Sequence, residues 1–301
     1  MNLTGLNHPP VSLLEAMNFW RISRRQIVLL LAASVLIPMM LRWFEHSQVY
    51  HPDRHLEATG AELGRSFQDV YFSSEGLKLN GWFYPANADS TRSSIVVLIC
   101  HGNGGNISHR LDITKALLTT GVNVFLFDYR GYGRSEGRPS EEGTYQDGMA
   151  ACQWLCRKGF AETNIVLFGE SLGGGIASEL ATRIHCAGLI LQSTFTSIVD
   201  IGAELFPWLP VRWIATIKYN TLSKLPRIKA PVLVMHSRDD RLIGFRHSQR
   251  NFAAANEPKL FCELVGEHND PLTNRGQFIA DIETFLQMLA TTAKQGAPSR
   301  R

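Results

Sequence analysis

The stretch of sequence that decides the fold is "NIVLFGESLGGGIASEL", at residues 164–180. Residues 165–168 form a short apolar run typical of a buried strand, and helix-compatible sequence follows the glycines. Between them, "GESLG" at 169–173 matches the pattern G-x-S-x-G in the strand–turn–helix context that it requires. A turn of this kind is strained and needs glycines beside the serine, because a Cβ there would clash. The stretch therefore predicts that Ser171 is an exposed nucleophile and that the amide of Leu172 faces the substrate oxygen.

A second glycine-rich stretch, "HGNGGN" at residues 101–106, follows the apolar run 95–100. A dinucleotide-binding fingerprint would need a third glycine at the next position, where this chain has Ile107. The other ligand that brings the main chain so close is the oxyanion of an acyl-transfer reaction, which requires a nucleophile at another strand end. Ser171 meets that requirement, so the oxyanion interpretation is favoured.

A serine hydroxyl is a poor nucleophile unless a base accepts its proton. With an elbow of this type the expected chain order is serine, then an acid, then histidine. His268 lies in "LVGEHNDPL" at 264–272, in a turn after the last predicted strand, where a loop can carry the imidazole back over the sheet. The other downstream histidines fall at a helix end, at a strand end and inside a helix: His185, His236 and His247. His268 is therefore the expected base.

The acid should follow the preceding strand, in "VLVMHSRDDRLIGF" at 232–245. This segment offers two adjacent carboxylates, Asp239 and Asp240, and both cannot point into one site. One of the two is expected to be an ordinary solvated turn residue. The pattern by itself leaves the choice between them open.

Strand-like runs alternate with helical segments along most of the chain, which predicts βαβ units and a mostly parallel sheet flanked by helices. Two strands joined by a turn, at 66–72 and 77–85, come first. The later predicted strands are 95–100, 122–127, 165–168, 189–191, 232–235 and 260–265, and the predicted helices are 108–118, 144–157, 172–184, 245–255 and 274–290. Residues 194–229 interrupt this rhythm and are expected to form a small cap over the strand ends where ligands bind.

The chain from residue 67 to 289 resembles the α/β-hydrolase superfamily, and within it the membrane-anchored, Bem46-like and serine-aminopeptidase-like (S33-type) group. The resemblance is carried by "HGNGGN" (101–106), "FDYRGYGRSEG" (127–137), "GESLGG" (169–174), "HSRDDRLI" (236–243) and "GEHND" (266–270). It implies the α/β-hydrolase fold over residues 67–291, with the acid at Asp240 and a second oxyanion amide at Asn103. The family usually has glycine where this chain has Ser237, and proline where it has Gly244, so Asp239 stays open as the alternative acid.

The residues before this domain differ in character. Residues 27–41 carry no charge, and an uncleaved signal-anchor helix is expected over 26–44, because no A-x-A-like cleavage site follows the apolar run. We expect a cytoplasmic segment at 1–25, a linker at 45–66 and a disordered tail at 292–301. Arginines are more frequent before the span (Arg21, Arg24, Arg25) than close after it (Arg42, Arg54), which favours a bacterial inner-membrane protein with its hydrolase domain in the periplasm. The odd set of five cysteines favours the opposite orientation.

Together these features predict a membrane-anchored serine hydrolase that acts through an acyl-enzyme, with Ser171 as nucleophile, His268 as base and Asp240 as its partner. No metal or organic cofactor is expected, the partner is a small-molecule acyl substrate, and a net charge of +3 gives no reason to expect nucleic acid. The apolar cap stretch 205–219 favours carboxylic esters with apolar acyl groups. The alternatives are a serine aminopeptidase-like peptidase, for which Glu204 could hold the substrate amine, an acyl-protein thioesterase, and an inactive membrane-tethered binding protein.

Overall fold

The computed structural model describes residues 23–296, and the side chains of residues 23–292. These residues form two separate units, one ending at Glu45 and one beginning at His46. The expected cytoplasmic segment 1–25 lies almost wholly outside the described residues, as does the end of the expected tail. The first part of that tail is helical, because helix α10 (Arg275–Gly296) continues past residue 292.

The first unit consists of most of helix α2, which spans Arg24–Val49 and contains Pro38. Its apolar side chains are exposed, and by length and composition the helix could cross a membrane. The helix includes the predicted span 26–44 and continues five residues beyond it, so its last turns belong to the second unit.

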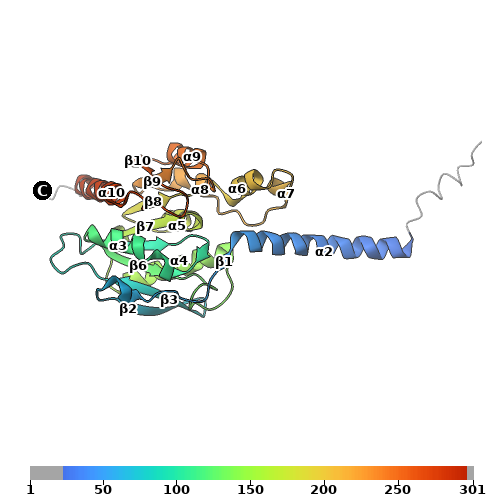
Figure 1. The fold of residues 1–301 in the computed structure, drawn as a ribbon, viewed down its shortest axis with the longest axis horizontal. Coiled ribbons are helices and arrows are strands. Elements are labelled where there is room, and N and C mark those ends of the chain that lie inside the picture. Colours follow the sequence, from blue (N-terminus) through green and yellow to red (C-terminus); the bar gives the residue numbers. More distant parts are fainter. Residues whose placement is uncertain (1–22, 297–301) are drawn as a thin grey trace, which may run out of the picture. The chain divides into compact units, whose positions relative to one another are not determined.

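The second unit is built on an eight-stranded sheet in the order β10-β9-β8-β7-β4-β6-β3-β2 (Figure 1). Only β3 runs against the other strands of this sheet. The strands are β2 (Gln68–Ser74), β3 (Leu77–Tyr84), β4 (Val96–Cys100), β6 (Asn123–Phe127), β7 (Ile165–Glu170), β8 (Gly188–Gln192), β9 (Val232–Ser237) and β10 (Lys259–Leu264). Each lies within one or two residues of its predicted position.

Helices cover both faces of the sheet, and for this reason the central strands are apolar without interruption. In β4, Val96 and Leu98 face one hydrophobic core while Val97 and Ile99 face the other. The first core also receives side chains from α4 (Glu141–Arg157), α5 (Leu172–Arg183) and α9 (Arg246–Ala254), and the second from α3 (Leu111–Thr119) and α10. The α/β-hydrolase fold expected from the sequence is confirmed.

The cap consists of short helices joined by loops. Its elements are α6 (Ile198–Leu205), α7 (Val211–Ile214), α8 (Thr221–Lys224) and the 3-10 turn η4 (Leu225–Arg227). Two of its tryptophans are exposed: Trp208 at 75% and Trp213 at 90%. Apolar residues of the stretch 205–219 therefore face solvent to a large extent.

The segment expected to be a polar linker is folded into the second unit. Val49 and Tyr50 are buried, and the short strand β1 (His51–Pro52) pairs in parallel with β5 (Gly104–Gly105). A 3-10 turn, η1 (Gly60–Leu63), follows, and its Gly60 carbonyl accepts a hydrogen bond from the hydroxyl of Tyr84. The difference arises because the segment is held by backbone bonds and by a few scattered apolar side chains, which leave no apolar periodicity in the sequence.

Candidate active site

Ser171 occupies the sharp turn between β7 and α5. Its backbone is left-handed, with φ at 51° and ψ at −114°, a conformation that costs free energy for any residue other than glycine. The turn needs glycine on both sides. A Cβ on Gly169 would lie 2.5 Å from Gly174, and one on Gly173 would lie 1.9 Å from the carbonyl oxygen of Cys100. The glycines of the pattern thus allow the backbone to pass close to its neighbours.

The structure brings the three residues expected to form a triad into one chain of contacts. His268 Nε2 lies 3.1 Å from Ser171 Oγ, and His268 Nδ1 lies 2.7 Å from Asp240 Oδ2. The adjacent Asp239 is exposed, and the structure gives it no contact with His268. The chain order serine, aspartate, histidine is the expected one, and the arrangement can move a proton from hydroxyl to imidazole.

Asp240 is held as an anion by donors that surround it. Its Oδ1 accepts the amides of Leu242 at 3.0 Å and Ile243 at 2.8 Å, while His236 Nε2 lies 3.2 Å from Oδ2. Burial by itself would raise the pKa of Asp240, but hydrogen bonds from His236, His268 and the Ile243 amide hold it well below its ordinary value. Sequence reasoning gave His236 no function. The four-residue spacing between His236 and Asp240 across a tight turn was the available signal.

Of the two amides expected to form an oxyanion hole, that of Leu172 directly follows the serine in the chain, and Asn103 lies at the same cavity. Leu172 is the first residue of α5, whose initial N–H groups have no acceptor within the helix. Asn103 shares the lining of a cavity with Ser171. Neither amide donates a hydrogen bond to another group among the residues that the structure describes. Both are thus available to a ligand oxygen.

The loop that carries Asn103 is tied to the elbow by an ion pair. Glu170, the residue before the serine, accepts from Arg110 Nε and Nη2, each at 3.0 Å. Arg110 Nη1 also donates to the carbonyl of Gly104 at 2.8 Å. Burial by itself would raise the pKa of Glu170, but the adjacent guanidinium outweighs burial and holds that pKa below its ordinary value. Sequence reasoning missed this pair because its members are 60 positions apart.

The cavity at Ser171 has a volume of about 720 Å³ and a mixed lining of polar and apolar groups. Its charged side chains are Asp53, Arg110, Asp112, Glu170 and Asp270. Its aliphatic side chains are Ile113, Pro271 and Leu272. Because Arg110 and Glu170 neutralise each other, the three remaining acids, for which the described part of the chain shows no ion pair, leave the cavity with negative charge.

The expected apolar wall from the cap is not found at this cavity. Among the residues that the structure describes, those lining it include none from 205–219. Glu204 is also engaged elsewhere, because Oε1 lies 2.6 Å from Arg246 Nη2 and Oε2 lies 3.1 Å from His247 Nε2. The expectation that the cap forms the acyl pocket, and that Glu204 holds a substrate amine, is therefore corrected. The direction in which an insertion folds depends on tertiary contacts that its composition does not encode.

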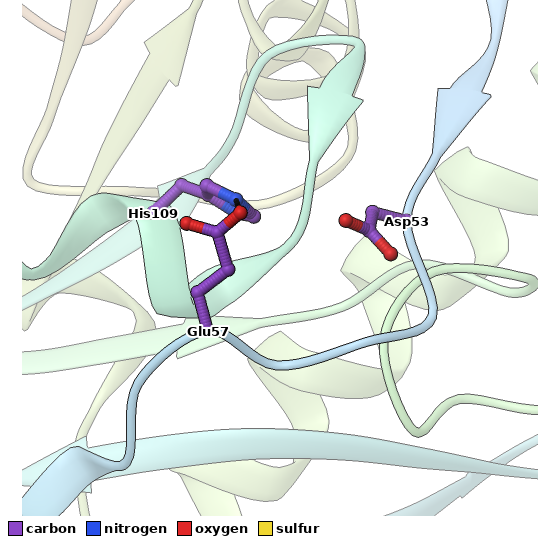
Figure 2. A group of neighbouring side chains, drawn as sticks. All are labelled: Asp53, Glu57 and His109. Atoms are coloured by element: carbon purple, nitrogen blue, oxygen red, sulfur yellow. Dashed lines mark ion pairs between the residues drawn. The ribbon is translucent and has the colours of Figure 1, made fainter.

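One corner of the cavity holds a small cluster of possible ligands. Figure 2 shows Asp53 and Glu57 facing His109, and the ligand atoms of these three residues lie within 4.8 Å of one another. His109 Nε2 lies 3.5 Å from Glu57 Oε1. The cluster is partly or fully exposed.

Comparisons with known proteins agree with this architecture. A family model for serine aminopeptidases of the S33 type matches residues 91–221, a range that contains Ser171 and Asn103 but ends before Asp240 and His268. An uncharacterized protein of Mycobacterium tuberculosis is 37% identical over 265 residues, which cover 86% of this chain and 92% of the relative. The α/β-hydrolase domain-containing protein WAV2 of Arabidopsis thaliana is 30% identical over 285 residues, covering 86% of this chain and 90% of WAV2.

Solved structures share the fold at lower identity. The esterase Pf2001 of Pyrococcus furiosus superposes with a TM-score of 0.65 at 21% identity, covering 79% of this chain and 98% of the esterase. An α/β hydrolase from Vibrio vulnificus gives a TM-score of 0.64 at 21% identity, covering 77% of this chain and 89% of its own. With an elbow at Ser171, an eight-stranded sheet of this order and relatives at 30% identity or more, the chain belongs to the α/β-hydrolase superfamily and is similar to its S33 serine aminopeptidases.

Proposed function

We propose that the protein is a serine hydrolase that cleaves carboxylic esters through an acyl-enzyme. The observation that carries the proposal is the contact chain from Ser171 Oγ through His268 to Asp240, at 3.1 and 2.7 Å, at the wall of a cavity. A hydroxyl, an imidazole and a buried carboxylate in this order form the arrangement that activates a serine.

In the proposed reaction, Ser171 Oγ attacks the ester carbonyl while His268 Nε2 takes its proton. Asp240 holds the imidazole with Nδ1–H directed at its carboxylate and stabilises the imidazolium that forms. The amides of Asn103 and Leu172 stabilise the negative charge on the carbonyl oxygen. The imidazolium then protonates the departing alcohol, and a water molecule activated by the same imidazole hydrolyses the acyl-enzyme.

The test is covalent labelling of the full-length chain with a fluorophosphonate, beside the Ser171→Ala variant and with p-nitrophenyl acetate as substrate. Wild type should be labelled and active, and Ser171→Ala should lose both properties. A folded wild-type chain that is neither labelled nor active would instead support the inactive binding protein.

The substrate proposed from the cavity is an ester with a short acyl chain. The apolar side chains available to it are few, and a long chain would meet the carboxylates of Asp53, Asp112 and Asp270. A preference for long apolar acyl groups would have required the cap. A series of p-nitrophenyl esters should give the highest kcat/KM at two to four carbons, and a maximum at eight or more carbons would contradict this choice.

A second candidate is an aminopeptidase, favoured by the acidic cavity and by the S33 family match. In that case Asp53, which lines the cavity, would hold the free ammonium group in place of Glu204. Aminoacyl p-nitroanilides compared with p-nitrophenyl esters separate the two activities. Faster cleavage of the anilides, with KM raised in Asp53→Asn, would favour the peptidase, and a thioester panel tests the third possibility.

We propose further that α2 anchors the chain in a bacterial inner membrane, with the catalytic unit in the periplasm. Support comes from the exposed apolar surface of α2 and from the three arginines at positions 21, 24 and 25 before it. Protease added to intact spheroplasts should digest the catalytic unit. Full protection would place that unit in the cytosol.

A further inference from the structure

The short segment that follows helix α2 directly runs beside the loop that carries Asn103. We call residues 51–53 the strap and residues 102–105 the oxyanion loop. Strand β1 of the strap pairs with strand β5 of the oxyanion loop, with His51 opposite Gly104 and Pro52 opposite Gly105. Figure 2 shows Asp53, the last residue of the strap, and Glu57, which follows it in the chain.

The strap bonds to the oxyanion loop through its backbone. The His51 amide donates to the carbonyl of Asn103 at 3.1 Å, and the Asp53 amide donates to the carbonyl of Gly105 at 3.2 Å. These bonds do not depend on the identity of either side chain. They also explain why a segment without apolar periodicity is ordered.

The strap is itself fastened to the body of the second unit. The Asp53 carbonyl accepts from the Gly133 amide at 2.9 Å and from Asn106 Nδ2 at 3.1 Å. On its N-terminal side, the hydroxyl of buried Tyr50 lies 2.9 Å from that of Tyr219. The strap is therefore a fixed support on which a loop can rest.

Every carbonyl of the oxyanion loop has a donor, and the strap supplies two of the four. Gly102 O contacts His101 Nδ1 at 2.7 Å, and Gly104 O accepts from Arg110 at 2.8 Å. The carbonyls of Asn103 and Gly105 are those bound by the strap, and Asn103 O also accepts from the hydroxyl of Tyr132 at 2.9 Å. Without the strap, Gly105 O would have no donor among the described residues.

We propose that the strap is a positioning element of the active site, which holds the Asn103 amide in the orientation that receives the oxyanion. The inference rests on the proposed function, because it assigns the loop the stabilisation of a tetrahedral intermediate. Glycine-rich backbone has little side-chain contact to fix it, so the direction of an N–H group depends on the bonds of the neighbouring peptide units. Loss of one oxyanion donor typically lowers turnover by a factor of about 10²–10³. A donor that is present but wrongly oriented should lower turnover by a smaller factor.

The strap lies immediately after the apolar helix, at chain positions that domain prediction assigned to a linker. A catalytic unit trimmed to the predicted domain would therefore lack part of its own site. The strap consequently belongs to the functional unit, and its role in ester hydrolysis is to position the loop.

The test compares two variants of the full-length chain in detergent, His51→Pro and His51→Ala. Proline removes the amide that binds Asn103 O, whereas alanine keeps that amide and removes the exposed imidazole with its contact to Gln48 O. We expect kcat for p-nitrophenyl acetate to be about 10-fold or more lower in His51→Pro than in His51→Ala, with KM changed less than about twofold. The rate of fluorophosphonate labelling should fall in parallel. Equal kcat values in the two variants would overturn the proposal.

Ser171→Ala, measured beside them, separates this proposal from the proposed function. A wild type no more active than Ser171→Ala would contradict the serine mechanism itself. An active wild type, with equal kcat in His51→Pro and His51→Ala, would contradict only the role of the strap. If His51→Pro does not fold, hydrogen exchange on the wild type replaces it. Phosphonylation of Ser171 should then slow exchange in peptides covering both 50–55 and 101–106. Slowing confined to 101–106 would overturn the role of the strap.

Discussion

The guanidinium of Arg110 and the carboxylate of Glu170 form a two-bond ion pair directly beside the candidate nucleophile, with both N–O distances at 3.0 Å. Arg110 is 9% exposed. A third bond, from Arg110 to Gly104 O, connects this pair to the oxyanion loop. The pair thus links the strand that carries the serine to the loop that carries Asn103.

Because Arg110 is buried and Glu170 is mostly shielded from solvent, we expect removal of the pair to be costly. Arg110→Met leaves the Glu170 carboxylate without its partner and should lower the free energy of unfolding by about 3–5 kcal/mol. Urea unfolding of the purified chain measures this loss. Arg134→Met is a matched control, because the Arg134–Asp69 pair is exposed and should contribute less than about 1 kcal/mol. Similar losses in the two variants would contradict the structural role of the buried pair.

The choice between the adjacent aspartates can be settled by a matched pair of variants. Asp240→Asn removes the acceptor that lies 2.7 Å from His268 Nδ1 and should lower turnover by about 10⁴, since the imidazole loses its orientation and its charge stabilisation. Asp239→Asn changes an exposed turn residue and should stay within about threefold of wild type. Initial rates with p-nitrophenyl acetate decide the matter, and a larger loss in Asp239→Asn would reverse the assignment.

Asp240 should also make stability depend on pH. Its pKa is lowered in the folded protein, so its ionised form stabilises the fold above the ordinary carboxyl value of about 3.9, and this contribution is lost as the pH falls toward the folded value. The Tm difference between wild type and Asp240→Asn should therefore be constant from about pH 7 to 5 and shrink below about pH 4. A difference that grows with acidity would mean that folding raises the pKa of this carboxyl instead of lowering it.

Alanine substitution should have opposite effects at two glycines of the site, although both belong to glycine-rich motifs. Gly173→Ala would place a Cβ 1.9 Å from the Cys100 carbonyl oxygen, so the elbow cannot form and both labelling and folding should be lost. Gly104→Ala meets no atom within 4 Å and should keep about wild-type Tm and activity. Thermal unfolding and labelling of the two variants test this contrast. Of the oxyanion loop, Gly105 has the strongest need for glycine, with φ at +79° and a Cβ position 2.7 Å from His109.

The sequence predicts those parts of the site that depend on local geometry. The elbow at Ser171 is encoded by five consecutive residues, and the order of Asp240 and His268 follows from which strands precede them. The strand and helix positions are equally local and are confirmed within a few residues. In each case a short window of sequence contains the physical cause.

Other parts of the site come from contacts between distant residues and could not be predicted. The strap pairs with a loop about fifty positions away through main-chain hydrogen bonds. Every residue except proline has the N–H that donates such a bond, so the pairing leaves no mark on the sequence. The Arg110–Glu170 pair and the support of Asp240 by His236 depend on how strands align. The direction of the cap is likewise tertiary, and for this reason an apolar composition at 205–219 gave a wrong expectation for the cavity.

The catalytic unit should need the residues before the predicted start of the domain. A chain beginning at His46 keeps the strap, whereas one beginning at Phe67, the predicted start of the domain, lacks it. Asn106 is fully buried, and its side-chain Nδ2 donates to the carbonyls of Asp53 and His55. The shorter chain lacks both of these acceptors. It also removes the acceptor of the Tyr84 hydroxyl.

Each unsatisfied buried polar group costs about 1–3 kcal/mol, so the chain from Phe67 should unfold at a Tm many degrees lower than the chain from His46. Its turnover should fall as well, because the carbonyls of Asn103 and Gly105 lose their donors from the strap. Thermal unfolding and p-nitrophenyl acetate hydrolysis of the two chains measure both effects. If the chain from Phe67 matched the chain from His46 in Tm and kcat, residues 46–66 would be a simple tether, as the sequence had suggested.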